Sequence, residues 1–220
     1  MGPKERRQRE REEIRSRILD AAREMFATEG YEAVTMRRIA EKIEYSPTAI
    51  YFHFRDKETL IRELCDCDFR MLAFQFHEIA RIDDPIERLR ATGRAYARFG
   101  LENPNQYRLM FMTPHPPLDP ETHSIERGNP EEDAYAFLKG TVADAIARGL
   151  FGGGHDDVEL LSQTIWAAVH GVISLQIAKH NDEWVDWKPF EARVDSMIDI
   201  IIAGLSRETA ATAKPAKETK

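Results

Sequence analysis

Residues 35–57, TMRRIAEKIEYSPTAIYFHFRDK, constrain the fold of this chain more than any other stretch. Thr35 is placed to cap a short helix whose apolar residues share one face. Ser46 and Pro47 then begin a second helix, with a hydroxyl cap followed by proline at the first helical position. The few residues between the two helices allow only a sharp corner. Helix, short turn and helix together form the helix-turn-helix arrangement, whose second helix enters the DNA major groove.

Amphipathic helices are predicted on both sides of this motif. Upstream, apolar residues recur with helical spacing from Ile14 to Phe26, and Gly30 stands where a helix C-cap belongs. Downstream, Asp56 is placed to cap a helix that begins at Lys57. Because two short helices cannot bury a core between them, the longer upstream helix is expected to pack across both. The result is a three-helix module that runs into the next helix without a flexible linker.

The rest of the chain is predicted to be helical as well. Runs of β-branched residues with period-two alternation are scarce, and apolar residues recur with helical spacing. Residues 113–130 contain five prolines and are predicted to be an exposed loop. The predicted fold class is all-α, with about nine helices. The later ones are expected near residues 86–103, 107–112, 131–150, 156–180 and 188–206.

The net charge of −7 is unevenly distributed along the chain. Residues 1–60 contain 13 Lys and Arg against 12 Asp and Glu, whereas residues 61–220 contain 18 against 26. Residues 1–10 are predicted to be a disordered basic arm. The arm either contacts DNA phosphates or the minor groove, or it is a solvated tail that keeps the protein in solution. Residues 207–220 have few apolar side chains and are predicted to be a disordered tail.

The last two predicted helices are apolar on more than one side. Between Ile165 and Ile173, apolar residues surround the helix instead of forming a stripe. Such a helix must be covered on two sides, and a chain of this size offers a core for one of them. A homodimer built from these two helices of each chain is therefore predicted; the alternative is a helix central to a monomer's core. The predicted interface residues are Ala167, Gly171, Ser174, Ile198, Ile201, Ile202 and Leu205.

Several short motifs occur in a characteristic order within the first 65 residues. They are Gly30-Tyr31, Val34-Thr35, Ile39-Ala40, Ser46-Pro47, Tyr51-Phe52-His53-Phe54 and Lys57-Glu58-Thr59-Leu60. Together they resemble the TetR family of bacterial transcriptional repressors. The resemblance implies a helix-turn-helix DNA-binding domain at residues 11–56, followed by a helical ligand-binding and dimerisation domain at residues 57–206. The stretch from Trp166 to Gly171 is similar to a motif that contains Trp, His and Gly. This motif occurs in one subgroup of TetR-type regulatory domains.

Glu44 departs from the family pattern, which has glycine in this turn. Glycine adopts positive φ freely and glutamate does not, so the turn either avoids that conformation or carries strain. The carboxylate also lies near the expected path of the DNA phosphates.

Specific DNA recognition needs some side chains at base edges and others at phosphates. The first turn of the helix that begins at Pro47 is the part that enters the groove, and Arg37 on the preceding helix suits guanine. The predicted base contacts are Arg37, Pro47, Thr48 and Ala49. The resemblance implies phosphate contacts from Thr35, Ser46, Tyr51, Phe52, His53 and Lys57. Ile50 and Phe54 are expected to be core residues. A symmetric dimer would place two such helices about 34–36 Å apart, so the operator in double-stranded DNA should be an inverted repeat.

A small apolar or aromatic molecule is the predicted effector. Bound among the helices after residue 57, it could tilt the helix that follows the DNA-binding motif and release the repressor from DNA. A 100-fold loss of operator affinity needs about 2.7 kcal/mol of differential binding. Ordinary core packing is the alternative role for each candidate pocket residue. The candidates are Phe74, Tyr96, Phe99, Tyr107, Met110, Phe111, Phe137, Trp166 and His170.

Other functional classes find less support in the sequence. There are no paired carboxylates in an evident cleft, no nucleophile elbow and no dinucleotide fingerprint, so no enzyme activity, catalytic residue, metal site or cofactor is predicted. Asp156 and Asp157 suit the capping of a helix better than metal binding. Cys65 and Cys67 point to opposite sides of a helix and cannot pair. A protein-interaction adaptor, or a ligand-binding protein without DNA binding, would leave the basic and aromatic residues around the second short helix unexplained.

The predicted location is the cytoplasm. No leader with a charged region followed by an apolar region is evident, and the longest apolar run, residues 165–178, is shorter than the roughly 20 residues that a membrane span needs.

Overall fold

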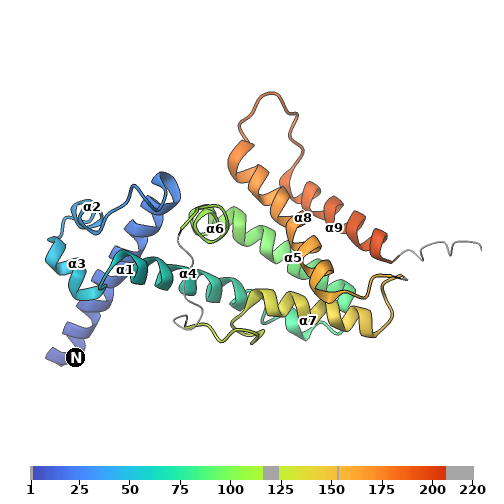
Figure 1. Ribbon diagram of the computed structural model, residues 1–220, viewed down its shortest axis with the longest axis horizontal. Helices are drawn as coiled ribbons and strands as arrows, with labels where there is room; N and C mark the ends of the chain where they lie inside the picture. Colours follow the sequence, from blue (N-terminus) through green and yellow to red (C-terminus); the bar gives the residue numbers. More distant parts are fainter. Residues whose placement is uncertain (1, 116–123, 153, 207–220) are drawn as a thin grey trace, which may run out of the picture. The chain divides into compact units, whose positions relative to one another are not determined.

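The computed structural model describes residues 2–115, 124–152 and 154–206, and the regular structure in these ranges is helical, without strands (Figure 1). This confirms the predicted all-α class. The predicted tail at 207–220, and residues 116–123 of the predicted loop, lie outside the described ranges. The helices are α1 (Pro3–Glu29), α2 (Met36–Lys42), α3 (Pro47–His53), α4 (Lys57–Phe74), the 3₁₀ helix η1 (Ile79–Arg81), α5 (Pro85–Glu102), α6 (Pro104–Phe111), α7 (Ala134–Ala147), α8 (Val158–Lys179) and α9 (Phe190–Leu205).

The chain forms two compact units, of which the first comprises residues 1–74 and 102–133. In this unit α1 packs against α2, α4 and α6, and α2 packs against α3. Phe26, Ile39 and Ile50 are fully buried in its core. Leu109 of α6 is buried in the same core. The three-helix module thus has α4 and α6 as further packing partners. The first compact unit therefore extends beyond residue 57, where the sequence places a domain boundary.

The predicted helix caps of the first unit are present. The Thr35 hydroxyl accepts a hydrogen bond from Arg38 N at 3.2 Å, and the Ser46 hydroxyl accepts one from Ala49 N at 3.2 Å. Asp56 accepts from Thr59 N at 2.8 Å, and this hydrogen bond lowers the pKa of the carboxyl to about 2. Gly30 ends α1 with φ of +82°. These caps position the short α2 and α3 at the ends that the sequence predicts.

Residues 3–10 are helical, whereas the sequence analysis predicts a disordered arm there. Gly2 N donates to the Glu5 carboxylate at 2.8 Å, which satisfies a backbone group at the start of α1. Gln8 donates to Glu12 at 2.6 Å, one turn later. Lys, Arg, Glu and Gln are strong helix formers, and α1 is already nucleated by its buried half. A polar segment that cannot form a core of its own can therefore still be helical, as an extension of α1.

The second unit comprises residues 75–101 and 134–220. Within it, α8 packs between α7 and α9 (Figure 1). Leu89, Val142 and Leu161 belong to its buried core. The α8 N-terminus is capped by Asp157, which accepts from Leu160 N at 2.9 Å and so has the predicted capping role. By length and composition alone, α8 is apolar enough to cross a membrane, but interior helices of water-soluble proteins pass the same test.

Candidate nucleic-acid interface

The helix α3 buries one face and exposes the other. Ile50 and Phe54 are 0% and 1% exposed, as expected of core residues. Phe52 is 70% exposed. The first turn, with Pro47 and Thr48, lies at the surface. A helix anchored by two apolar side chains therefore presents its N-terminal turn outward, which is the geometry that groove entry requires.

Arg37 extends from α2 into solvent. Its side chain is 79% exposed, and its Nε lies 2.9 Å from the Glu41 carboxylate. Exposed ion pairs one turn apart contribute only about 0.3–0.5 kcal/mol, so this pair can open at little cost. The guanidinium is thus accessible for the predicted bidentate contact with guanine.

Glu44 adopts the left-handed conformation that its position in the turn requires. Its φ is +60°, and it is the one non-glycine residue with positive φ in the described part of the chain. The turn therefore carries strain, which decides the alternative left open by the sequence. Arg17 of α1 supports this turn, since it donates to Ile43 O at 3.3 Å and lies 5.2 Å from the centre of the Tyr45 ring.

Arginines of α1 pack over the aromatic end of α3. The Arg15 guanidinium lies 4.4 Å from the centre of the Phe54 ring and donates to His53 O at 3.2 Å. One turn earlier, Arg11 lies 5.2 Å from the centre of the Phe52 ring. These contacts are not among those predicted from the sequence, although the spacing of four residues between the two arginines is a signal that could indicate them.

The surroundings of His53 favour the neutral form of its imidazole. Its Nδ1 is buried without a hydrogen-bond partner. Burial, with the nearby charges of Arg11 and Arg15, lowers the pKa of the imidazole. A neutral imidazole still carries one N–H donor, which is what a phosphate contact would use.

Lys57 has a structural role in addition to its predicted one. Its ammonium donates to Tyr31 O at 2.9 Å and to Val34 O at 3.1 Å, and it lies 3.9 Å from the centre of the Tyr31 ring. These contacts tie the start of α4 to the segment between α1 and α2. An ammonium has three N–H donors, so one is left to serve a phosphate.

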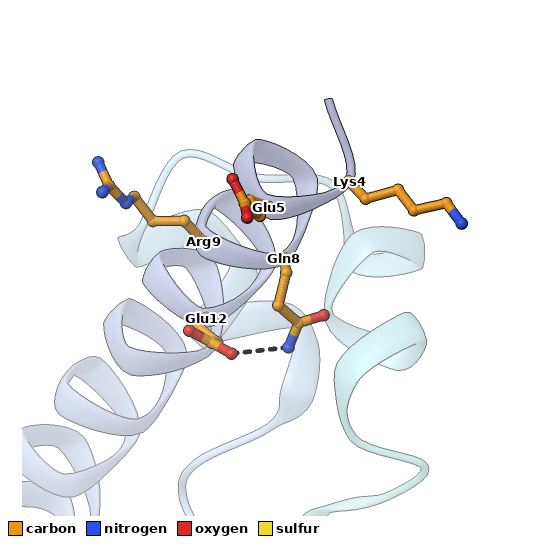
Figure 2. Close-up of a pocket in the computed structure, with 5 residues that line it drawn as sticks. All are labelled: Lys4, Glu5, Gln8, Arg9 and Glu12. Carbon is orange, nitrogen blue, oxygen red and sulfur yellow. Dashed lines mark hydrogen bonds between the residues drawn. The ribbon is translucent and has the colours of Figure 1, made fainter. Parts of the chain in front are cut away.

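A shallow hollow lies on the exposed N-terminal half of α1 (Figure 2). Side chains of this single helix line it, and they carry both signs of charge. Gln8 and Glu12 form a hydrogen bond across its base. This hollow is a gap between solvated side chains and has no apolar wall that would enclose a small molecule.

Two family models match the chain. Residues 18–64 match bacterial regulatory proteins of the tetR family, and residues 89–201 match the tetracyclin repressor-like C-terminal domain. The chain belongs to the TetR family. Membership confirms the resemblance seen in the first 65 residues and places the chain among regulatory proteins rather than enzymes. The similarity of residues 166–171 to one subgroup stays a prediction.

Curated relatives of this TetR-family chain are transcriptional regulators. UidR of Escherichia coli (strain K12) is 38% identical over 80 residues, which are 36% of this chain and 38% of UidR. AcnR, a transcriptional repressor of Corynebacterium glutamicum, is 35% identical over 96 residues, which are 44% of this chain and 45% of AcnR. The matched segments thus span less than half the length of these relatives.

Solved structures of regulatory proteins share the whole fold. A tetR-family regulatory protein from Rhodococcus RHA1 has a TM-score of 0.67 at 20% identity, over 87% of this chain and 96% of that chain. FadR, a fatty acid degradation regulator from Bacillus halodurans, has a TM-score of 0.67 at 16% identity, over 94% of this chain and 99% of that chain. The likeness confirms the predicted architecture of a helix-turn-helix domain and a helical C-terminal domain.

The predicted pocket residues of the first unit differ in their burial. Tyr107 and Met110 are buried, and the ring of Phe111 lies 4.9 Å from that of Tyr107, between centres. Phe74, in contrast, is 67% exposed at the end of α4. Core packing accounts for the buried residues of this group.

The predicted pocket residues of the second unit include a polar contact. Trp166 Nε1 donates to the Tyr96 hydroxyl at 2.9 Å. His170 follows one turn later on α8, and burial lowers the pKa of its imidazole. Phe99 and Phe137 are buried. The indole of Trp166, which is 36% exposed, thus lies beside a phenol and an imidazole, since its ring centre is 6.5 Å from that of His170.

The predicted dimer residues differ in their burial. Ile198, Ile202 and Leu205 are buried within the second unit itself, because α9 turns these side chains inward. Ala167 is exposed, and a Cβ built on Gly171 meets nothing within 4 Å. Ser174 and Ile201 are half-buried. A stripe on α8 with spacings of three and four residues faces outward; it consists of the exposed Leu160, Thr164, Ala167, Leu175 and Ala178 and the half-buried Gly171.

Replacing Glu44 separates strain from charge in the turn. Glu44→Gly should raise the free energy of unfolding by about 0.5–1 kcal/mol, because glycine relieves the positive φ. Glu44→Ala keeps the strain and should not stabilise the protein. Both substitutions remove the carboxylate and should raise DNA affinity alike. Denaturant unfolding and DNA titration measure the two effects, and equal stabilisation by both variants would contradict the strain.

Arg37 and Tyr51 should differ in what they contribute to binding. Arg37→Ala should relax the sequence preference at one operator position, at a cost of about 1–3 kcal/mol. Tyr51→Phe deletes a hydroxyl on an exposed ring, so it should weaken binding to all sequences alike and leave the unfolding temperature unchanged. Binding to a randomised operator library distinguishes these patterns. Equal loss of affinity across the library for both variants would refute the division between base and phosphate contacts.

Proposed function

We propose that this TetR-family chain is a DNA-binding transcriptional repressor that recognises an inverted-repeat operator as a homodimer. The observation that carries the proposal is the outward presentation of the first turn of α3, anchored by the buried Ile50 and Phe54. The relatives UidR and AcnR, named as a regulator and a repressor, support it. Such a protein acts where the bacterial chromosome lies, in the cytoplasm. An adaptor without DNA binding would have no use for this exposed turn.

Selection from a random-sequence duplex library at fixed salt tests the proposal. The expected product is an inverted repeat whose half-sites are about one helical turn, 34–36 Å, apart. A gel shift with the DNA that flanks the chain's own gene then measures affinity over a salt series. A Thr48→Glu variant, which places a carboxylate in the first turn, is the negative control. Recovery of no preferred sequence by the wild-type protein would refute the assignment.

The dimer interface is assigned to the exposed α8 stripe, together with Ile200 of α9. Ile200 is 69% exposed, and Leu175 is 50% exposed. Small residues in the stripe, such as Gly171, allow two helices to approach closely. The buried Ile198, Ile202 and Leu205 are not needed for this contact, because they stabilise the second unit from inside.

Ala167→Glu should convert the dimer to a monomer, because it places a charge at the centre of the stripe. Ala147→Glu makes the same change at an exposed position of α7 and is the matched control. Light scattering coupled to gel filtration gives the mass of each variant. A dimeric Ala167→Glu protein, or a monomeric wild type, would exclude this interface.

The effector site is assigned to the second unit, around Tyr96, Trp166 and His170. The Tyr135 ring lies 5.8 Å from that of Trp166, between centres, and extends this aromatic group. An apolar or aromatic compound that bears one hydrogen-bonding group fits such surroundings. Bound preferentially to the conformation that does not fit the operator, it would release the repressor.

Titration with candidate apolar compounds should quench tryptophan fluorescence and reduce operator affinity in parallel. Trp166→Phe should abolish the saturable part of the quenching. Trp184 is 96% exposed and serves as the control fluorophore in that variant. Saturable quenching without any change in operator affinity would rule out the release mechanism.

A further inference from the structure

One face of the N-terminal half of α1 carries basic side chains without acidic ones. Lys4, Arg7, Arg11 and Arg15 follow each other at spacings of three and four residues, so they form one stripe, named here the basic stripe. At 3.6 residues per turn, each glutamate before residue 18 lies roughly a quarter turn or more from its centre. Figure 2 shows Lys4 and Arg9 pointing in opposite directions, with Arg9 outside the stripe. A tail kept only for solubility would not need this separation.

Three of the carboxylates off the stripe are engaged within the helix. Glu5 accepts from Gly2 N at 2.8 Å, and Glu12 accepts from Gln8 at 2.6 Å. Glu10 lies 3.4 Å from the Arg6 guanidinium. These interactions stay on the other faces of α1. The glutamates of this segment therefore do not neutralise Lys4, Arg7 and Arg11, whereas Arg15 pairs with Glu63 of α4.

The basic stripe lies on the side of α1 that faces α3. Its last two members mark that side, because Arg15 donates to His53 O and Arg11 lies over the Phe52 ring. The stripe also continues the apolar face formed by Ile18 and Met25, which packs into the core of the first unit. Where α1 extends past α3 (Figure 1), this face changes from apolar to basic. Lys4, Arg7 and Arg11 are exposed there.

We infer that Lys4, Arg7 and Arg11 form a second DNA contact, which holds phosphates outside the base pairs that α3 reads. Seven residues of helix rise about 10 Å, and duplex DNA carries one charge per about 1.7 Å of its axis, so the stripe spans several phosphates. The partner is the nucleic-acid backbone, because the stripe leads directly to the exposed end of α3. The inference rests on the proposed function, since it extends the same interface.

Two double variants, each of which loses two positive charges, test the inference. Lys4→Gln with Arg7→Gln removes two charges from the basic stripe. Arg6→Gln with Arg9→Gln removes two from the remaining faces of the same turns and is the matched control. Glutamine is nearly as good a helix former as lysine or arginine, so circular dichroism should show equal helix content. None of the four side chains contacts the core of the first unit.

Fluorescence anisotropy with a long mixed-sequence duplex measures the effect over a salt series. The stripe variant should lose roughly tenfold in affinity and show a log–log salt slope shallower by about 1.8, as expected for two lost phosphate contacts. The control should stay within about twofold of the wild type in the same range of salt. On a duplex cut back to the base pairs under the α3 helices, the stripe variant should match the wild type.

Equal weakening by the two double variants would overturn the inference, because it would show a general charge effect. Wild-type affinity and salt slope for the stripe variant would overturn it as well. The proposed function fails separately: a stripe-dependent loss on mixed-sequence DNA, without any preferred operator, would keep this contact and reject sequence-specific repression. Absence of binding to every duplex by the wild-type protein would reject both.

Discussion

The burial of Ile50 and Phe54 is the constraint on which the DNA-binding surface depends. Isolated helices as short as α3, Pro47–His53, are unstable in water, so the helix needs its anchors as well as its cap. Each fully buried side chain of this size contributes about 1.5–3 kcal/mol. Because these two residues occupy the inner face, Thr48, Tyr51 and Phe52 must lie outside. The same contacts that stabilise the helix therefore orient the surface that meets DNA.

Arginine side chains of α1 then join α3 to α4, beginning with the hydrogen bond that Arg15 donates to His53 O. Arg23 of α1 and Asp68 of α4 form a bidentate pair, with N–O distances of 2.9 and 3.1 Å, and Asp68 is 1% exposed. Removing one member of such a buried pair costs about 3–5 kcal/mol, more than the roughly 2.7 kcal/mol that a 100-fold release from DNA requires. An effector of the proposed kind would therefore shift the operator equilibrium more easily by moving α4 together with α3 than by separating them.

Local signals predicted the helix-turn-helix motif, because hydroxyl caps, Pro47 and apolar spacing act over a few residues. Features that depend on packing between residues far apart in the sequence could not be predicted. Leu109 completes the first core from α6, and nothing near it in the sequence indicates that. The apolar character of α9 is evident from its isoleucines, but periodicity did not show that Ile198 and Ile202 face inward. The helical start of α1 is not evident from the sequence, because a polar, charged composition is compatible with both disorder and a solvated helix. At Glu44 the sequence left two conformations open, because the turn geometry depends on how α2 and α3 pack.

The overall charge of −7 does not oppose DNA binding in this fold, because the charges act over short distances. At physiological ionic strength the Debye length is about 8 Å, whereas an α-helix with its side chains is about 10–12 Å across. Carboxylates on the far side of α1 are thus largely screened from phosphates at the basic stripe. Glu44 is the exception, since its exposed carboxylate lies in the turn that immediately precedes the first turn of α3. What matters for this interface is therefore the face on which each charge lies, and a count of charges along the sequence does not contain that information.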